Sequence, residues 1–145
     1  MNLSKNFTLE ELTKSSVGEN IPTKEVINNL QQVVTHILQP TRDHFGPVKV
    51  NSGYRSPTVN KAVGGATNSQ HMTGNAVDFE VPGIPNATVA QWIVDNCPYD
   101  QVILEFYTGG NTGWVHASWA PKRRCKLLIA NKDGKKTVYR EVRRF

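Results

Sequence analysis

Cysteine is scarce in this chain, which holds only Cys97 and Cys125 among its 145 residues. Two cysteines without CxxC spacing do not amount to a disulfide framework. We expect both to be reduced thiols, although the sequence alone leaves a pairing between them open. No apolar run approaches the ~20 residues that cross a bilayer, so we expect no membrane span. The N-terminal MNLSKNFTLEEL lacks the apolar stretch of a secretory signal, and none is expected.

Acidic residues are nearly absent from the C-terminal part of the chain. From Lys122 onward there are ten Lys or Arg against two acids, a net of +8, whereas the preceding part holds seven against ten, a net of −3. A basic segment of this kind favours a polyanionic partner, either nucleic acid or a bacterial envelope polymer such as teichoic acid or anionic lipid. A solvated hairpin that only aids solubility fits equally well. Aromatic residues are few in this segment and no recognition module is apparent, so no specific nucleic acid is expected.

Apolar spacing and capping residues predict four helical regions in the first hundred residues. The first begins at the N-cap Thr8, and the second begins near Pro22-Thr23 and is kinked or interrupted by Pro40. The third begins at Ser56-Pro57 and ends at Gly64-Gly65. The fourth is capped by Thr88. No repeat, linker or domain boundary is visible, and 145 residues suffice for one domain with a real core.

Alternating residues predict strands over 47–55, 76–81, 101–107 and 114–119, followed by a hairpin with strands over 126–130 and 137–142. Asp78, Glu105 and His116 each lie on the polar face of a strand whose other face is apolar. Phe106 is expected on the apolar face of its strand, with Val102 and Leu104. A sheet with helices behind it and a polar cleft in front accommodates this pattern, which predicts an α+β domain over 1–145, with a basic hairpin at about 122–145.

The loop-rich stretch from Val50 to Glu80 concentrates the residues that could carry chemistry. His71 and Asp78 lie seven positions apart, with a glycine-containing bend between them. Imidazole and carboxylate are ordinary zinc ligands, and a catalytic zinc needs three protein ligands. His116 is the candidate for the third. Each residue also has a plainer interpretation, Asp78 as the polar face of a half-buried strand and His116 as a packed core histidine.

Four motifs point to a known family: SGYRSPxVNxAVGG, SQHxxGxAxD, DQxIxEF and WVHxS. Together, over about 7–119, they resemble the zinc D-Ala-D-Ala carboxypeptidase family. Within that family, the chain most resembles the short single-domain members, which are common in bacteriophages and bacteria. That family includes peptidoglycan endopeptidases and shares its fold with the Hedgehog signalling domain. The resemblance implies a small antiparallel sheet with helices on one face and a zinc cleft on the other. It also implies one Zn²⁺ held by His71, Asp78 and His116.

The resemblance assigns further roles in substrate binding and catalysis. Arg55 would face the zinc and bind a substrate carbonyl or carboxylate, stabilising the oxyanion of the transition state. Its plainer role is an ion pair with a carboxylate such as Glu80. Ser69 would hold substrate or only cap its loop, and Gln101 is a further candidate for substrate binding.

The general base is harder to assign. Many family members place it three or two residues before the last histidine, where this chain has Gly113 and Trp114. Glu105 is therefore the candidate base. Alternatively, it orients a ligand histidine as a hydrogen-bond acceptor.

The leading hypothesis is a monomeric zinc metallopeptidase, a D,D-carboxypeptidase or peptidoglycan endopeptidase, that cuts an amide bond in stem peptides or cross-links. A bacteriophage endolysin, a virion-associated lysin and a cellular enzyme all remain open. A phage lysin would pass from the host cytoplasm to the periplasm and cell wall. The alternative is a catalytically idle, zinc-stabilised domain that binds the cell wall or has a structural role.

Overall fold

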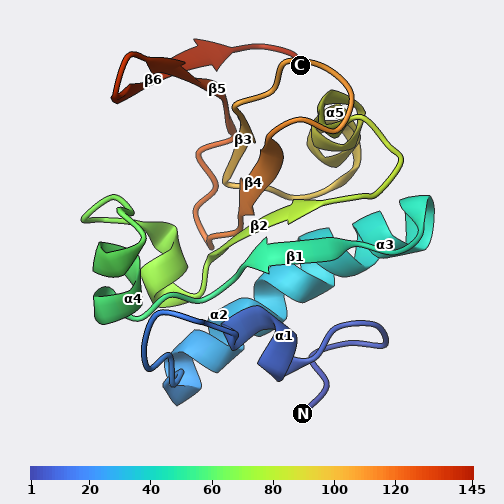
Figure 1. The fold of residues 1–145 in the computed structure, drawn as a ribbon. Coiled ribbons are helices and arrows are strands. Elements are labelled where there is room, and N and C mark those ends of the chain that lie inside the picture. Colours follow the sequence, from blue (N-terminus) through green and yellow to red (C-terminus); the bar gives the residue numbers. More distant parts are fainter.

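A six-stranded sheet with the strand order β1-β2-β4-β3-β5-β6 runs through the computed structural model, which describes residues 1–145 (Figure 1). All neighbouring strands are antiparallel except β3 and β5, which are parallel. The strands are β1 (Lys49–Ser52), β2 (Ala76–Glu80), β3 (Gln101–Glu105), β4 (Trp114–Ser118), β5 (Lys126–Asp133) and β6 (Lys136–Val142). The helices are α1 (Leu9–Thr13), α2 (Lys24–Val33), the π-helix η1 (Val34–Leu38), α3 (Gln39–Phe45), α4 (Pro57–Ala62), the 3₁₀ helix η2 (Gln70–Thr73) and α5 (Asn86–Asn96). The expected α+β class is confirmed, with one parallel pair in a sheet expected to be antiparallel.

One face of the sheet is covered by helices and holds the core. Helices α1 to α3 lie along the β1–β2 side and α5 along the β3–β4 side (Figure 1). The strand residues on this back face are apolar and buried: Val77, Phe79, Val102, Leu104, Val115 and Ala117. Because strand side chains alternate, the intervening residues of the same strands emerge on the opposite, front face. None of the helices is both long enough and apolar enough to span a bilayer.

Side-chain caps begin three of the helices where the sequence predicts them. The hydroxyls of Thr8, Thr23 and Ser56 accept hydrogen bonds from the backbone of Glu11, Val26 and Val59. Each such cap contributes about 1 kcal/mol by satisfying an amide that lacks a helical partner.

The predicted cap at Thr88 is wrong, because α5 already begins at Asn86. Pro85 occupies the cap position, and its carbonyl accepts from the amides of Thr88 and Val89. Asn86 is buried, and its side-chain amide donates to the carbonyls of Thr112 and Gly113.

Of the two outcomes predicted at Pro40, a kink or an interruption, the interruption is wrong, since the helix continues without a break from α2 through η1 into α3. The turn before the proline is widened: the amide of Gln39 donates to the carbonyl of Val34, five residues earlier. A π-turn shifts the backbone hydrogen-bond pattern by one residue. The helix can therefore accommodate proline, which lacks an amide hydrogen and carries a bulky ring.

The alternation of β3 reverses at its end. Phe106 has φ +55°, in the left-handed region, and the strand stops at Glu105. Phe106 therefore lines the front cleft instead of joining Val102 and Leu104 in the core, while Tyr107 packs against the core. The expectation for Phe106 is wrong because one left-handed residue turns the chain over.

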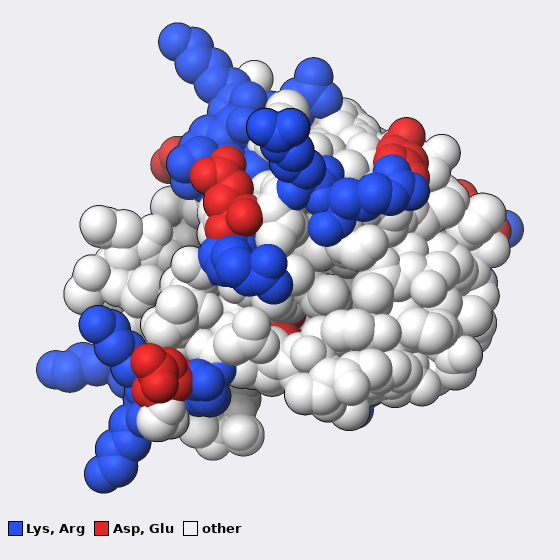
Figure 2. Space-filling view, turned by 90° about the horizontal axis from the view of Figure 1, so that it is seen from above, with Lys and Arg blue, Asp and Glu red and all other residues white.

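The basic C-terminal segment belongs to the main sheet. β5 pairs along the whole of β3, with Ala130 opposite Glu105, and β6 pairs with β5 (Figure 1). The expected hairpin is confirmed and is longer than predicted. Lys and Arg gather over this end of the molecule with few acids among them (Figure 2). Cys97 is buried, Cys125 is exposed, and both are free thiols.

Candidate metal centre and its cleft

Three side chains that are far apart in the sequence meet on the front face. Asp78 of β2 lies directly opposite His116 of β4, and His71 reaches them from η2. Asp78 Oδ1 lies 2.9 Å from His116 Nδ1 and 3.3 Å from His71 Nε2. One ligand atom from each residue falls within 4.8 Å of the others, and all three residues are buried. Ligands about 2.0–2.2 Å from a tetrahedral ion lie about 3.3–3.6 Å apart, so the spacing approximates that of zinc ligands.

His71 is held in the orientation that a ligand requires. Its Nδ1 lies 2.8 Å from the carbonyl oxygen of Gly53. A carbonyl can only accept, so Nδ1 carries a proton, and Nε2, the nitrogen on the Asp78 side, is the atom that becomes a ligand once it gives up its own proton. Gly53 itself packs closely against α1, because a Cβ there would lie 2.3 Å from the carbonyl oxygen of Leu12. A second backbone contact joins the Arg55 amide to the His71 carbonyl.

The electrostatics of the centre favour an ionised carboxylate. Burial raises the pKa of Asp78, but the charges and hydrogen bonds of His71 and His116 outweigh burial and hold it well below its usual value. A metal ligand must be deprotonated, and a set of two imidazoles and one carboxylate suits zinc. The donor set and its spacing therefore fit the metal that the sequence predicts.

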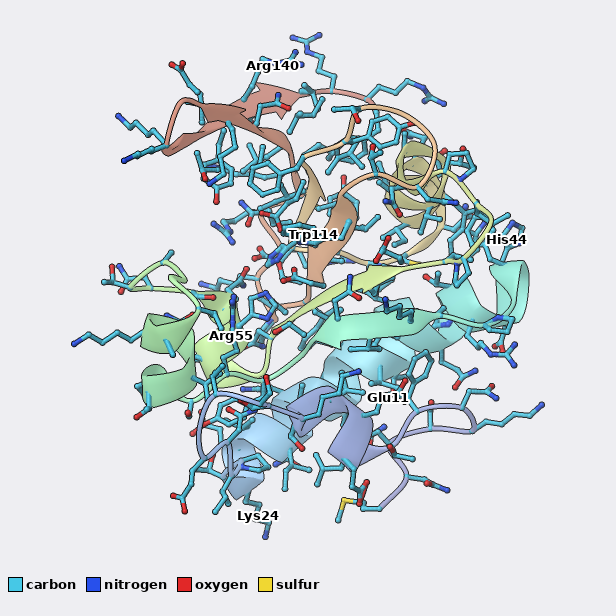
Figure 3. All side chains as sticks on the ribbon, in the orientation of Figure 1. Glu11, Lys24, His44, Arg55, Trp114 and Arg140 are labelled. Atoms are coloured by element: carbon cyan, nitrogen blue, oxygen red, sulfur yellow. The ribbon has the colours of Figure 1, made fainter.

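Arg55 lies on the α4 side of the cleft and Trp114 on the strand side (Figure 3). The guanidinium forms no ion pair, and its buried Nε has no hydrogen-bond partner. Burial lowers the pKa of Arg55, while the carboxylates of Asp78 and Glu105 act to raise it. The alternative pairing with Glu80 does not form, since Glu80 instead accepts from the side-chain amide of Asn51. Arg55 thus presents an uncompensated positive charge to the cleft.

Glu105 of β3 lies on the same front face of the sheet. It pairs with Trp114 of β4, two residues before His116. Its Oε2 accepts a hydrogen bond of 2.7 Å from the indole nitrogen of Trp114. Burial, followed by the charge of Asp78, raises the pKa of Glu105 above its usual value. The structure therefore gives Glu105 an indole as its hydrogen-bond partner, and no hydrogen bond to a ligand histidine is present. A partly buried carboxyl with a raised pKa is suited to accept a proton.

Gly113 occupies the position where the resemblance would place a base, and it has no room for one. A Cβ at Gly113 would lie 1.9 Å from the carbonyl oxygen of Glu105, and φ is +65°. The backbone turn that packs Gly113 against β3 therefore excludes any side chain. The absence of a carboxylate there follows from this turn, and a base has to come from another element.

Ser69 and Gln101 both line the cleft, which has a volume of about 550 Å³. Ser69 Oγ accepts from the backbone amide of His71, so it caps the turn that carries the ligand. Gln101 begins β3 and lies opposite Ser118 of β4. The structure brings all seven candidate site residues to one cavity, namely Arg55, Ser69, His71, Asp78, Gln101, Glu105 and His116. Their roles toward substrate and metal remain predictions.

A network that supports the loop of His71 was not predicted. The carboxylate of Asp100, which is 2% exposed, accepts from the guanidinium and backbone amide of Arg124 and from the side chain of Gln70. Arg124 also donates to Gln70 Oε1. Gln70 and Asp100 lie inside motifs quoted above, but Arg124 is 54 positions from Gln70 and 24 from Asp100, and only the fold reveals the link.

Arg124 belongs to the segment that the sequence predicts to be a basic hairpin. The network ties this segment to Gln70, the residue beside His71. Together with the strands that β5 and β6 add to the sheet, it brings part of this segment to the wall of the cleft, namely Arg124, Leu128, Lys132, Thr137 and Tyr139.

Comparison with known proteins gives two matches. A family model described as Peptidase M15 matches residues 5–118. The zinc D-Ala-D-Ala carboxypeptidase of Streptomyces albus G is 38% identical over 76 residues. The aligned part covers 51% of this chain and 29% of that relative, so the chain spans less than a third of the relative's length.

Proposed function

Because the chain belongs to the peptidase M15 family, we propose that it is a zinc metallopeptidase that hydrolyses an amide bond in peptidoglycan stem peptides or cross-links. The family expected from the motifs is confirmed, whereas the activity is a proposal supported by that membership. The observation that carries it is the convergence of His71, Asp78 and His116 in one cleft that also holds an unpaired arginine and a carboxyl group. The carboxypeptidase of Streptomyces albus G carries a name consistent with this chemistry.

In the proposed site, His71 Nε2, Asp78 Oδ1 and His116 Nδ1 would hold one Zn²⁺. A bound zinc would act as a Lewis acid and would lower the pKa of a water molecule from 15.7 toward about 7. The Gly53 carbonyl keeps His71 in the tautomer that ligation needs.

Glu105 takes the proton of the attacking water and delivers it to the leaving amine. Its raised pKa brings it nearer to the working pH, which suits a group that must both gain and lose a proton. The indole of Trp114 donates to one oxygen of the Glu105 carboxylate and leaves the other free. Arg55 directs its charge at the oxygen of the scissile carbonyl as negative charge develops there. Ser69 and Gln101 contact the peptide.

The test is mass spectrometry of purified muropeptides after incubation with the zinc-loaded protein, the chelated protein and the Glu105→Gln variant. We expect new products with the loaded protein only. Reloading the chelated sample with Zn²⁺ should restore them. An unchanged muropeptide profile with fully loaded protein would refute the activity and favour the alternative, an idle zinc-stabilised domain that binds cell wall.

The biological setting is a further part of the proposal. The resemblance to short phage-type members supports a bacteriophage endolysin or a virion-associated lysin, acting in the periplasm or cell wall after release from the host cytoplasm. The gathering of Lys and Arg over the β5–β6 end supports an added attraction to anionic envelope polymers (Figure 2). We propose that the protein acts as a monomer.

A further inference from the structure

The β5–β6 hairpin forms a wall of the cleft that lies beyond the family match. That match ends at residue 118, whereas β5 and β6 cover 126–133 and 136–142. Lys132, Thr137 and Tyr139 line the same cavity as the three candidate metal ligands. The family match therefore does not account for everything that a substrate would touch in this cleft.

The register of the sheet brings Tyr139 into line with Glu105. Ala130 lies opposite Glu105 on one side and opposite Tyr139 on the other, so the three side chains form one row on the front face. Only a methyl group separates the phenol from the carboxyl group in that row. The phenol is 54% exposed and so accessible to a ligand, and it is neutral at neutral pH, where it can donate a hydrogen bond; burial, followed by the charges of Glu105 and Asp78, raises its pKa further.

Phe106 supplies an apolar surface beside this row. Its left-handed backbone turns the ring into the cleft, at 5.3 Å from the ring of Trp114. A bulky residue in that conformation costs about 1–3 kcal/mol, and such strain concentrates at ligand sites. The Lys132 ammonium lies 5.3 Å from the centre of the Phe106 ring.

The two cationic residues on the hairpin side of the cleft differ in whether their charge is already compensated. Arg124 is bound to Asp100 and Gln70. Lys132 forms no ion pair, and its polar contact is Thr137 Oγ1 at 3.3 Å. Lys132 therefore has a positive charge free to meet a ligand, next to a phenol and an aromatic ring. Arg55 has the corresponding free charge on the α4 side of the cleft (Figure 3).

We propose that Lys132 and Tyr139, backed by Phe106, form a second substrate subsite that binds a carboxylate-bearing segment of the peptide. The ammonium pairs with the carboxylate, the phenol donates a hydrogen bond, and the aliphatic part of the segment lies on the aromatic rings. The hairpin thereby determines which stem peptides the cleft accepts. This inference rests on the proposed function, because it deepens the specificity of the same site.

The test measures binding separately from catalysis. Synthetic stem peptides, in which each carboxylate in turn is replaced by a carboxamide, are titrated calorimetrically into the zinc-loaded Glu105→Gln variant. The peptide in which the carboxylate bound by Lys132 has become a carboxamide should bind about tenfold more weakly than the parent, as expected for the loss of a charge-assisted contact. Adding Lys132→Gln should weaken binding of the parent peptide by a similar factor and remove the preference for that carboxylate. Adding Tyr139→Phe should weaken it about threefold.

Lys136→Gln is the matched control, because it makes the same change in charge on the opposite face of the hairpin, away from the cavity. It should leave both the affinity and the carboxylate preference unchanged. Equal losses in the Lys132 and Lys136 variants would indicate diffuse surface charge and overturn the subsite. An unaltered preference in Lys132→Gln, or no binding of any peptide, would overturn it as well.

The two proposals fail in different ways. If the wild-type protein cleaves no stem peptide while carboxylate binding through Lys132 persists, the proposed function is wrong and the subsite stands. If cleavage occurs but Lys132→Gln binds and discriminates as before, the activity stands and the subsite is wrong.

Discussion

The two faces of the central sheet are built from the same strands but hold opposite kinds of residue. On the back, Phe79 and Val115 are fully buried among helices and contribute to stability through apolar packing. On the front, their immediate neighbours Asp78 and His116 are also nearly buried, yet they are polar and contact one another. Burying polar groups is costly unless they are paired. Asp78 and His116 offset this cost by pairing with each other, whereas burial leaves Glu105 with a raised pKa and a cost at neutral pH. The back face supplies the stability against which that cost is set.

The largest expected effect comes from removing a ligand on the front face. His116→Ala should reduce bound zinc from about one ion per chain to near zero and abolish hydrolysis, while the apolar back face keeps the chain folded. Metal analysis after gel filtration measures the bound zinc, and a circular dichroism spectrum checks that the variant is folded. Undiminished zinc in this variant would rule out His116 as a ligand.

Next in size is the substitution Glu105→Gln. It keeps the size of the side chain and an oxygen for the Trp114 indole, but removes the proton acceptor. General acid–base catalysis contributes about 10²–10⁴-fold, and kcat at full zinc occupancy should fall by that order. A decrease smaller than about threefold would remove Glu105 from the mechanism.

The same variant also separates function from stability through its pH dependence. The folded-state pKa of Glu105 is raised above 4.5. Its contribution to stability is thus present below about pH 4.5 and is lost as the pH rises through the folded-state value. Metal-free Glu105→Gln should therefore melt at a higher temperature than the metal-free wild type near pH 7, with the gap closing near pH 4. An equal gap at both pH values would mean that the ionised carboxylate is not destabilising.

The back face should show the reverse pattern. Phe79→Ala opens a cavity between β2 and the helices and should lower the free energy of unfolding by about 3–5 kcal/mol. The fraction that remains folded should keep its zinc and its specific activity. Urea unfolding followed by activity per folded molecule makes the comparison. Loss of turnover with unchanged stability would show that the two faces are not separable in this way.

The smallest effect is expected at the tip of the hairpin, away from the cleft and from the buried core. Replacing Lys135 and Lys136 with Gln should weaken binding to isolated cell walls a few-fold at low salt. Little difference is expected at physiological ionic strength, where the Debye length is about 8 Å. Cleavage of small soluble peptides should not change. A salt-independent loss of wall binding would indicate that these residues make specific contacts.

Local sequence signals predicted much of this architecture. The caps at Thr8, Thr23 and Ser56 depend on a side chain and an amide three residues away, so a short window contains the whole interaction. The alternation in β2 likewise separates Phe79 from Asp78 within a few residues. The errors at Pro40 and Phe106 have a common origin, since each depends on a backbone conformation, a π-turn or a left-handed residue, that residue types alone do not specify.

By itself, the sequence determined the α+β class, the family and the residues that carry the chemistry, because periodicity, caps and motifs are properties of neighbouring positions. Only the tertiary structure decided how those residues meet. The pairing of β2 with β4 sets Asp78 against His116, and the close approach of Gly53 orients His71. Parallel pairing of β5 with β3 moves a basic hairpin from the periphery into the wall of the cleft. These contacts join positions 18 to 38 residues apart, and no local pattern of residues encodes such pairings.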